Sequence, residues 1–215
     1  MKIEAVLNEA AKLSEGKLSP EAEKYVAWVK SYVGAKPKFR NFEILAAEHF
    51  DTDYGLRGPR SLVGMAAAIR TRQNDIFVRE GNESSALHEL VHATGFDDAT
   101  VGTFFSEGFT QLVTEEIADL HHVVVPRTYR DNVGYARRIV EDVLFLDVKA
   151  FARRYAKASK KAEWVADEML KNGEVAFDNE EDWGPKSKIR GRIIQELMAY
   201  GGSFPLIDQL IDPKY

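Results

Sequence analysis

Residues 85–95 read Ser-Ala-Leu-His-Glu-Leu-Val-His-Ala-Thr-Gly and place two histidines, His88 and His92, four positions apart. On a helix with 3.6 residues per turn, this spacing puts both imidazoles on one face, one turn apart. Two such imidazoles can supply two ligands of a tetrahedral zinc site, with Glu89 beside the open coordination position. A carboxylate there can accept a proton from a metal-bound water. The stretch therefore predicts a short metal-binding helix with Glu89 as general base.

The residues around this stretch favour a helix of limited length. Asn82, Ser84 and Ser85 can accept hydrogen bonds from the first free backbone N–H groups, so we expect one of them to cap the helix. Gly95 follows soon after His92, and glycine commonly ends a helix because it adopts a left-handed backbone without steric cost. The competing interpretation is an accidental match to the motif on a helical surface.

Composition restricts the class of protein. The chain has 215 residues, enough for one domain with a sizeable core, and it contains no cysteine. Disulfide frameworks, cysteine-ligated zinc and cysteine nucleophiles are therefore excluded. A formal net charge of −5 argues against a general affinity for nucleic acid. The N-terminus lacks an uninterrupted apolar segment and no window is apolar enough to span a membrane, so we expect no signal peptide, no membrane span and a cytoplasmic protein.

Hydrophobic spacing predicts many helices and a small sheet before the motif. Ser19-Pro20-Glu21 is a helix start, with a capping serine and a proline in the first turn. Residues 39–47 fit a strand or a helix, whereas 61–70 and 75–79 fit strands. The free edge of the strand at 75–79 is expected to pair with an extended peptide. Helices are expected at residues 3–13, 20–33, 101–120, 128–146, 147–158, 162–170, 189–200 and 204–211. These patterns indicate an α+β fold that is mostly helical.

A catalytic zinc site needs a third protein ligand besides the two histidines. Glu107 lies on the next predicted helix, within a stripe of polar side chains that can hydrogen-bond coordinating groups. In this stripe Thr110 and Gln111, one turn beyond Glu107, are the predicted partners of the metal ligands. Gly108 removes a side chain where two helices are expected to approach closely. Glu107 is therefore the preferred third ligand.

Other acidic residues compete with Glu107. Asp98 completes the pattern H-E-x-x-H-x-x-G-x-x-D, close to the metzincin arrangement in which a glycine turn brings the third ligand round. That class also needs a methionine turn downstream, and both Met169 and Met198 fall inside predicted helices. The glutamates at 115–116 follow on the same helix as Glu107, where a salt bridge or contact with solvent is the expected role. The residues alone leave Asp98 open as an alternative ligand.

The stretch His88–His92, followed by Glu107-Gly108-Phe109-Thr110, resembles the gluzincin metallopeptidases. That clan includes thermolysin and the zinc aminopeptidases, and its third ligand is a glutamate on the next helix, often in an Asn-Glu-Gly-Phe setting. This chain has Ser106 in place of the asparagine. Residues 88–95 are also similar to the zincin domain of anti-restriction-type proteins. The resemblance covers about residues 75–120, and the chain lacks the Gly-x-Met-Glu-Asn motif of the aminopeptidases.

The resemblance implies a single zincin-like metallopeptidase domain over residues 1–215. Within it we expect N-terminal helices in 1–35, the sheet and zinc-binding helices in 36–125, and a helical C-terminal part in 126–215. The flanking helices match no family, so the resemblance does not extend to the substrate.

By the same resemblance one Zn2+ per chain is bound by His88, His92 and Glu107, and Glu89 is the general base. The expected reaction is hydrolysis of a peptide bond in a peptide or protein substrate. The oligomeric state is not determined by these residues.

Such a peptidase also needs a donor for the negative charge that develops on the substrate oxygen. Tyr129 and Tyr135 are the nearest downstream candidates. Tyr129 is preferred because it lies closer to the N-terminal end of the helix that follows Pro126. The alternative hypothesis is a zincin-fold binding or regulatory module whose metal is structural or lost. The intact Glu89 favours the peptidase, since a structural site needs no base.

Overall fold

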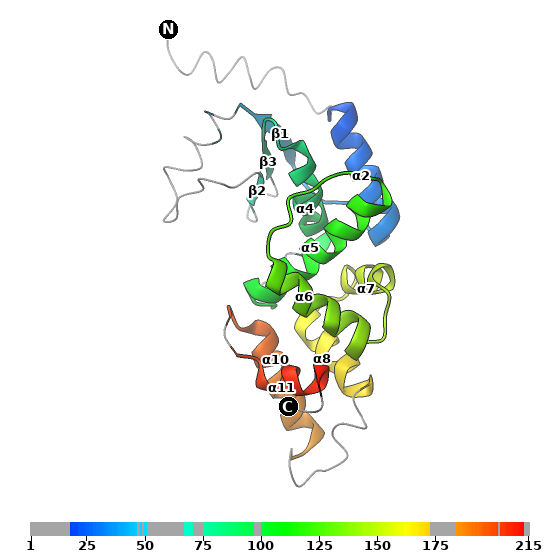
Figure 1. Cartoon of the computed structure of the whole chain (residues 1–215), viewed down its shortest axis with the longest axis vertical. Coiled ribbons are helices and arrows are strands. Elements are labelled where there is room, and N and C mark those ends of the chain that lie inside the picture. The colour runs from blue at the N-terminus through cyan, green and yellow to red at the C-terminus, as the bar shows by residue number, and fades with distance from the viewer. Residues whose placement is uncertain are drawn as a thin grey trace.

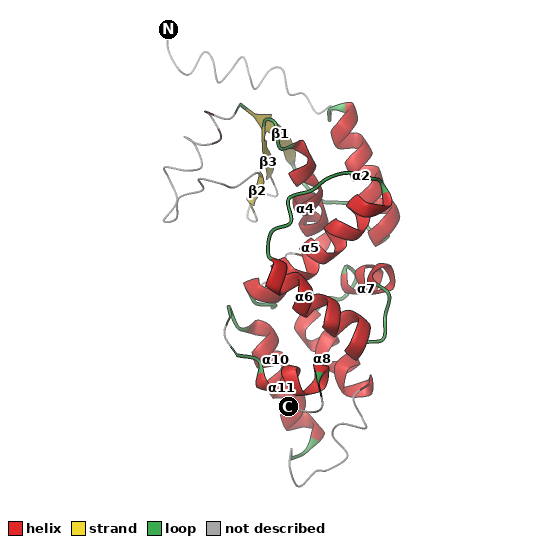
Figure 2. Ribbon diagram, in the orientation of Figure 1, coloured by secondary structure: helices red, strands yellow, loops and turns green. Residues whose placement is uncertain are grey.

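The computed structural model describes residues 18–46, 48, 50, 67–70, 75–96, 100–172, 184–201 and 203–212. This part of the chain is α+β and mostly helical, with a small sheet at one end, as predicted (Figures 1 and 2). The strands are β1 (Asn41–Leu45), β2 (Ala67–Arg70) and β3 (Asp75–Arg79). The α-helices are α2 (Pro20–Val33), α4 (Ala86–Val91), α5 (Thr103–Leu120), α6 (Arg130–Arg138), α7 (Val148–Tyr155), α8 (Lys161–Asn172), α10 (Lys186–Met198) and α11 (Pro205–Ile211).

Helix α2 begins and ends where its capping residues predict. The Ser19 hydroxyl accepts a hydrogen bond from Ala22 N, and Pro20 occupies the first helical turn. At the other end Gly34 adopts a left-handed backbone with φ 73°, and its N–H donates to the carbonyl of Lys30. Its buried face packs on α4, so α2 supports the helix that carries the histidines.

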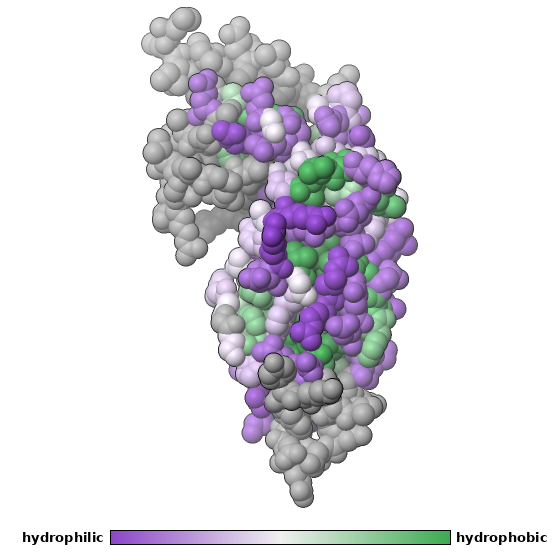
Figure 3. All heavy atoms as spheres, in the orientation of Figure 1, coloured by the Kyte–Doolittle hydropathy of each residue, from purple (hydrophilic) through white to green (hydrophobic). Residues whose placement is uncertain are grey.

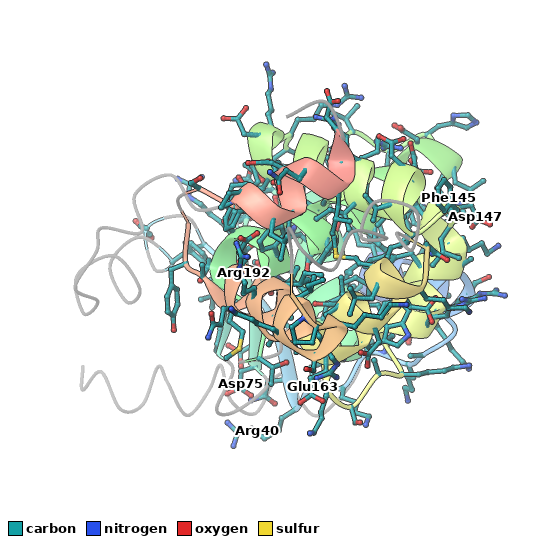
Figure 4. The ribbon with its side chains drawn as sticks, turned by 90° about the horizontal axis from the view of Figure 1, so that it is seen from below. Arg40, Asp75, Phe145, Asp147, Glu163 and Arg192 are labelled. Carbon is teal, nitrogen blue, oxygen red and sulfur yellow. The ribbon has the colours of Figure 1, made fainter. Side chains whose placement is uncertain are left out.

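The sheet has the order β1-β3-β2, with β1 parallel and β2 antiparallel to the central strand β3. The segment 39–47, which fitted a strand or a helix, therefore contributes a strand. The prediction of a free edge on 75–79 is wrong, because β3 pairs with a neighbour on both sides. Asp75, which is 2% exposed, accepts two hydrogen bonds from the Arg40 guanidinium, and Figure 4 shows the two side chains together. This pair ties the start of β3 to the residue before β1.

The helix of the two histidines is short and irregular at both ends. It follows a 3-10 turn, Glu83–Ser85, whose carbonyls accept from the first helical N–H groups, including that of Ala86. Within the described residues neither Asn82 nor Ser85 forms the side-chain cap that we predicted, because the 3-10 turn already satisfies these donors. Residues His92–Phe96 continue as a π-helical turn that stops at Gly95, where φ is 101°. The predicted glycine stop is confirmed.

Helix α5 is central to the packing and contacts α2, α4, α6 and α7. Its close approach to α6 depends on Gly108, because a Cβ there would lie 2.7 Å from the carbonyl oxygen of Asn132. The Asn132 amide donates to the carbonyl of Phe104 across the same contact. The apolar face of α5 is fully buried in one hydrophobic core shared with β3, α4 and the C-terminal helices. The close approach predicted at Gly108 is confirmed.

The C-terminal helices differ from the predicted ones mainly at their boundaries. The helix predicted at 128–146 begins later: Tyr129 is the cap residue of α6, which passes into a π-helical turn, Ile139–Val143. The helix predicted at 147–158 is α7, and Asp147 caps it by accepting from Ala150 N at 2.7 Å. The lower half of Figure 1 shows α8, α10 and α11 packed beyond α6.

Within the described ranges, no helix is both long and apolar enough to cross a membrane. Several predictions fall outside these ranges and have no structural counterpart here: the helix at 3–13, most of the strand at 61–70, and Asp98 as an alternative ligand.

Candidate metal centre

Three side chains from two neighbouring helices converge on one point. His88 Nε2 lies 3.0 Å from Glu107 Oε2, His92 Nε2 lies 3.4 Å from the same oxygen, and the two Nε2 atoms are 3.1 Å apart. One ligand atom from each residue falls within 4.8 Å of the other two, a spacing that could hold a metal ion. The residues predicted as metal ligands are thus adjacent, because α4 and the following turn pack against the first turns of α5.

Gln111 determines which nitrogen of His88 faces this point. The Gln111 amide donates through Nε2 to the carbonyl of Pro126 at 2.9 Å and to Glu115 Oε1 at 3.1 Å, which orients its oxygen toward His88. His88 Nδ1 lies 2.9 Å from Gln111 Oε1, and an amide oxygen only accepts. Nδ1 therefore carries the proton in the neutral ring, and the Nε2 lone pair is directed at Glu107.

His92 is oriented in a related way. Its Nδ1 lies 3.3 Å from the hydroxyl of Thr110, which is fully buried in α5. The next turn of α5 is also held internally, since the Thr114 hydroxyl donates to the carbonyl of Thr110. With Nδ1 occupied by this hydroxyl, Nε2 of His92 is the nitrogen that faces Glu107. The partners predicted for the metal ligands, Gln111 and Thr110, are in contact with the two imidazoles.

The electrostatics of Glu107 are those of an anion held beside two imidazoles. Burial by itself raises the pKa of this carboxyl, but imidazoles that carry a proton on Nε2 would donate to it and attract it, and these interactions with His88 and His92 bring the pKa well below its usual range. Two lone pairs and a carboxylate that converge within 3.4 Å repel one another unless a proton or a cation lies between them. Two imidazole nitrogens and one carboxylate oxygen are a ligand set that zinc prefers. The residues present therefore fit a zinc ion.

Glu89 and Tyr129 complete the surroundings of the three ligands. Glu89, on the same short helix, is 8% exposed. The Tyr129 ring stacks on His88, with 6.0 Å between ring centroids. Burial, together with the charges of Glu107 and Glu89, raises the pKa of Tyr129 to about 12. Like an unperturbed tyrosine, this phenol is protonated at neutral pH, and it is a hydrogen-bond donor next to His88.

The other candidates lie in different environments. Tyr135 donates a short hydrogen bond to Asp208 and packs among the rings of Phe104, Phe105 and Phe204, which is a structural role. Glu116 pairs with Arg137 at 2.9 Å and so links α5 to α6. Neither belongs to the group of three ligand atoms.

The carbonyl of Pro126 was missed by sequence reasoning. This carbonyl accepts a hydrogen bond from Gln111, which in turn contacts His88. Every residue has a backbone carbonyl, so the type of residue at position 126 does not indicate such a contact. A proline after a predicted helix indicates a loop, but the point where that loop returns to the helix depends on tertiary packing.

Comparison with known proteins gives one partial similarity. Over 86 residues the chain is 33% identical to the bifunctional cordycepin biosynthesis cluster protein 3 of Cordyceps militaris. The match covers 40% of this chain but only 10% of that protein, so the chain spans a small part of the relative's length. That protein's name refers to a biosynthesis cluster and describes no chemistry at a His-His-Glu site. No family model matches the chain, and no solved structure matches it.

Proposed function

We propose that the chain is a zinc-dependent metallopeptidase with a zincin-like fold, which hydrolyses a peptide bond in a peptide or protein substrate. The observation that carries the proposal is the convergence of His88 Nε2, His92 Nε2 and Glu107 Oε2, with the Nδ1 atom of each histidine held by a polar side chain. Such outer contacts fix ring orientation and increase the basicity of ligand nitrogens. The resemblance of the same residues to the gluzincins supports the reaction class.

The roles of the remaining residues follow from their charge and position. A bound zinc ion would polarise a substrate carbonyl and bring the pKa of a coordinated water to about 7. Glu89 is the base that takes a proton from water and delivers it to the leaving amine nitrogen. The Tyr129 hydroxyl, which is protonated at neutral pH as in any tyrosine, donates to the substrate oxygen as negative charge develops there.

A binding or regulatory module with a structural metal is the alternative. Its zinc would stabilise the packing of α4 on α5 and perform no chemistry. The presence of Glu89 beside the ligands favours the peptidase, because a closed structural site uses a fourth protein ligand and needs no base. The two functions predict different results when the Glu89 carboxylate is removed: the peptidase would lose cleavage activity, and the module with a structural metal would be unchanged.

The first test measures zinc content by elemental analysis and peptide cleavage by mass spectrometry on a degenerate peptide library. We expect about one zinc per wild-type chain, loss of that zinc in Glu107→Ala, and retention in Asp98→Ala and Glu116→Ala. Glu89→Gln should keep zinc but cleave at least ~100-fold more slowly, because the general base is lost.

Zinc retained in Glu107→Ala but lost in Asp98→Ala would support the metzincin-like ligand set instead. A wild-type protein that binds zinc but cleaves no peptide, with Glu89→Gln unchanged in every respect, would support the structural alternative. A wild-type chain that binds no added zinc would refute the peptidase and a module with a structural metal, and would leave only a module whose metal has been lost.

A further inference from the structure

Residues 123–129, called the strap below, connect α5 to α6 and cross in front of α4 and α5 (Figure 1). A hydrophobic area lies over this connection in Figure 3, and Val124 in the strap is 89% exposed. The strap carries no regular secondary structure of its own. It ends at Tyr129, whose ring stacks on His88. The position of the proposed oxyanion donor therefore depends on what fastens an otherwise irregular segment.

The buried amide of Gln111 fastens the strap and orients a metal ligand at the same time. Its nitrogen donates to the carbonyl of Pro126 at 2.9 Å, three residues before Tyr129. Its oxygen lies 2.9 Å from His88 Nδ1 and also accepts a longer hydrogen bond, 3.5 Å, from the hydroxyl of Thr128. Both ends of one planar group are thus engaged: the oxygen contacts His88 and, at the longer distance, Thr128 of the strap, and the nitrogen donates to Pro126 of the strap.

The backbone at Tyr129 needs such an attachment. Tyr129 has φ 56° and ψ 37°, a left-handed conformation that non-glycine residues adopt rarely and that surrounding contacts must maintain. Its carbonyl accepts from Val133 N at 2.8 Å, which holds it on the α6 side. On the other side, the bond from Gln111 to Pro126 holds the preceding strap. A free strap would relax toward ordinary φ values and move the phenol.

We infer that Gln111 is a positioning residue that couples His88 to Tyr129, holding the metal-binding nitrogen and the oxyanion donor in one arrangement. This role rests on the proposed function. It also explains why an amide suits the position: a carboxylate could accept from His88 but could not donate to Pro126. It would also face Glu115, whose oxygen lies 3.1 Å from the amide nitrogen.

The experiment separates the two ends of the amide with two substitutions. Gln111→Glu keeps an acceptor for His88 and removes the donor to Pro126, whereas Gln111→Ala removes both. Zinc affinity reports the His88 end. Tryptic cleavage after Arg127 and Arg130, followed by site-resolved mass spectrometry on the full-length folded protein, reports the strap, since both arginines are exposed. The matched control is Gln195→Glu, the same change on an exposed residue of α10.

We expect Gln111→Glu to bind zinc within about threefold of wild type, because a carboxylate replaces the amide oxygen, while strap cleavage rises about tenfold. Gln111→Ala should show the faster cleavage together with ~10–100-fold weaker zinc binding. The control Gln195→Glu should match wild type in both measurements. This partial rescue by the conservative variant would not arise if Gln111 only filled space.

The coupling would be overturned if Gln111→Glu were cleaved in the strap at the wild-type rate. It would also be overturned if Gln111→Glu bound zinc as weakly as Gln111→Ala does. A wild-type chain that binds no zinc would refute the proposed function and, with it, the His88 end of the coupling. In that case faster cleavage in Gln111→Glu would still show that the strap is attached through Gln111, so the two failures are distinguishable.

Discussion

At the residue scale, the candidate centre is organised by groups that do not face the metal position. Gln111 and Thr110 occupy the Nδ1 atoms of His88 and His92, and both lie almost completely buried in α5. Each imidazole therefore presents Nε2 without having to reorient. Since reorganisation at the moment of reaction costs rate, such pre-orientation is what an enzyme site requires.

Tyr129 provides a prediction at this scale. Replacing it by Phe removes the hydroxyl while keeping the ring that stacks on His88. We expect kcat for the best library peptide to fall by about 100-fold, the usual effect of losing one oxyanion donor, with zinc content unchanged. Tyr200→Phe, at an exposed tyrosine, is the matched control. A Tyr129→Phe variant with wild-type kcat would remove this residue from the proposed mechanism.

At the element scale, the packing of α5 against α6 is decided by one missing side chain. A Cβ at Gly108 would lie 2.7 Å from the backbone oxygen of Asn132, too close for an ordinary contact. Because Glu107 is the adjacent residue, the same contact also positions this proposed ligand relative to the histidines. Helix packing and ligand geometry are therefore linked at this point.

Gly108→Ala is accordingly expected to destabilise the protein by about 1–3 kcal/mol, as overpacking does, in denaturant unfolding monitored by circular dichroism. Gly191→Ala is the control, since a Cβ at this position in α10 meets nothing within 4 Å. It should stabilise by about 0.5–1 kcal/mol, because alanine favours a helix over glycine. Equal effects of the two substitutions would contradict the close-packing explanation.

At the scale of the whole molecule, a bound metal would join separate parts of the fold. The histidines lie on α4 and the turn after it, and α4 packs on α2 and on the sheet. Glu107 lies on α5, which packs on α6 and α7 toward the C-terminal helices. A ligand that binds only the native state stabilises it by RT ln(1 + L/Kd), where L is the free ligand concentration, so the stabilisation grows with the logarithm of L once this exceeds Kd. Metal binding should therefore stabilise the fold as a unit.

Removing the metal tests this expectation. At free zinc of 100 times Kd the stabilisation is ~2.7 kcal/mol, which corresponds to a rise in Tm of roughly 5–10 °C for a chain of this size. Chelation should reverse the rise in wild type, and Glu107→Ala should show little change with or without zinc. Scanning calorimetry measures both. A similar zinc-dependent shift in Glu107→Ala would indicate that the ion binds elsewhere.

The amino-acid sequence by itself determined the local features whose causes lie within a few residues. The caps at Ser19 and Asp147 and the glycine stop at Gly95 were predictable because the capping atoms and the helix ends are neighbours in the chain. The pairing of His88 with His92 was predictable for the same reason, since helical periodicity alone puts them on one face. The mostly helical α+β class followed from hydrophobic spacing summed over many residues.

Tertiary structure alone decided the features that depend on distant segments. Strand β3 has no free edge because β1, some thirty residues earlier, pairs with it in parallel. Thr128 does not cap α6, and Tyr129 takes up a left-handed backbone next to His88. The strap is attached to Gln111 through the backbone carbonyl of Pro126, and every residue has such a carbonyl, so the sequence does not indicate this contact. The sequence shows which groups are able to form hydrogen bonds. It does not show which distant groups come within 3 Å of each other, because such contacts form only when the whole core has packed.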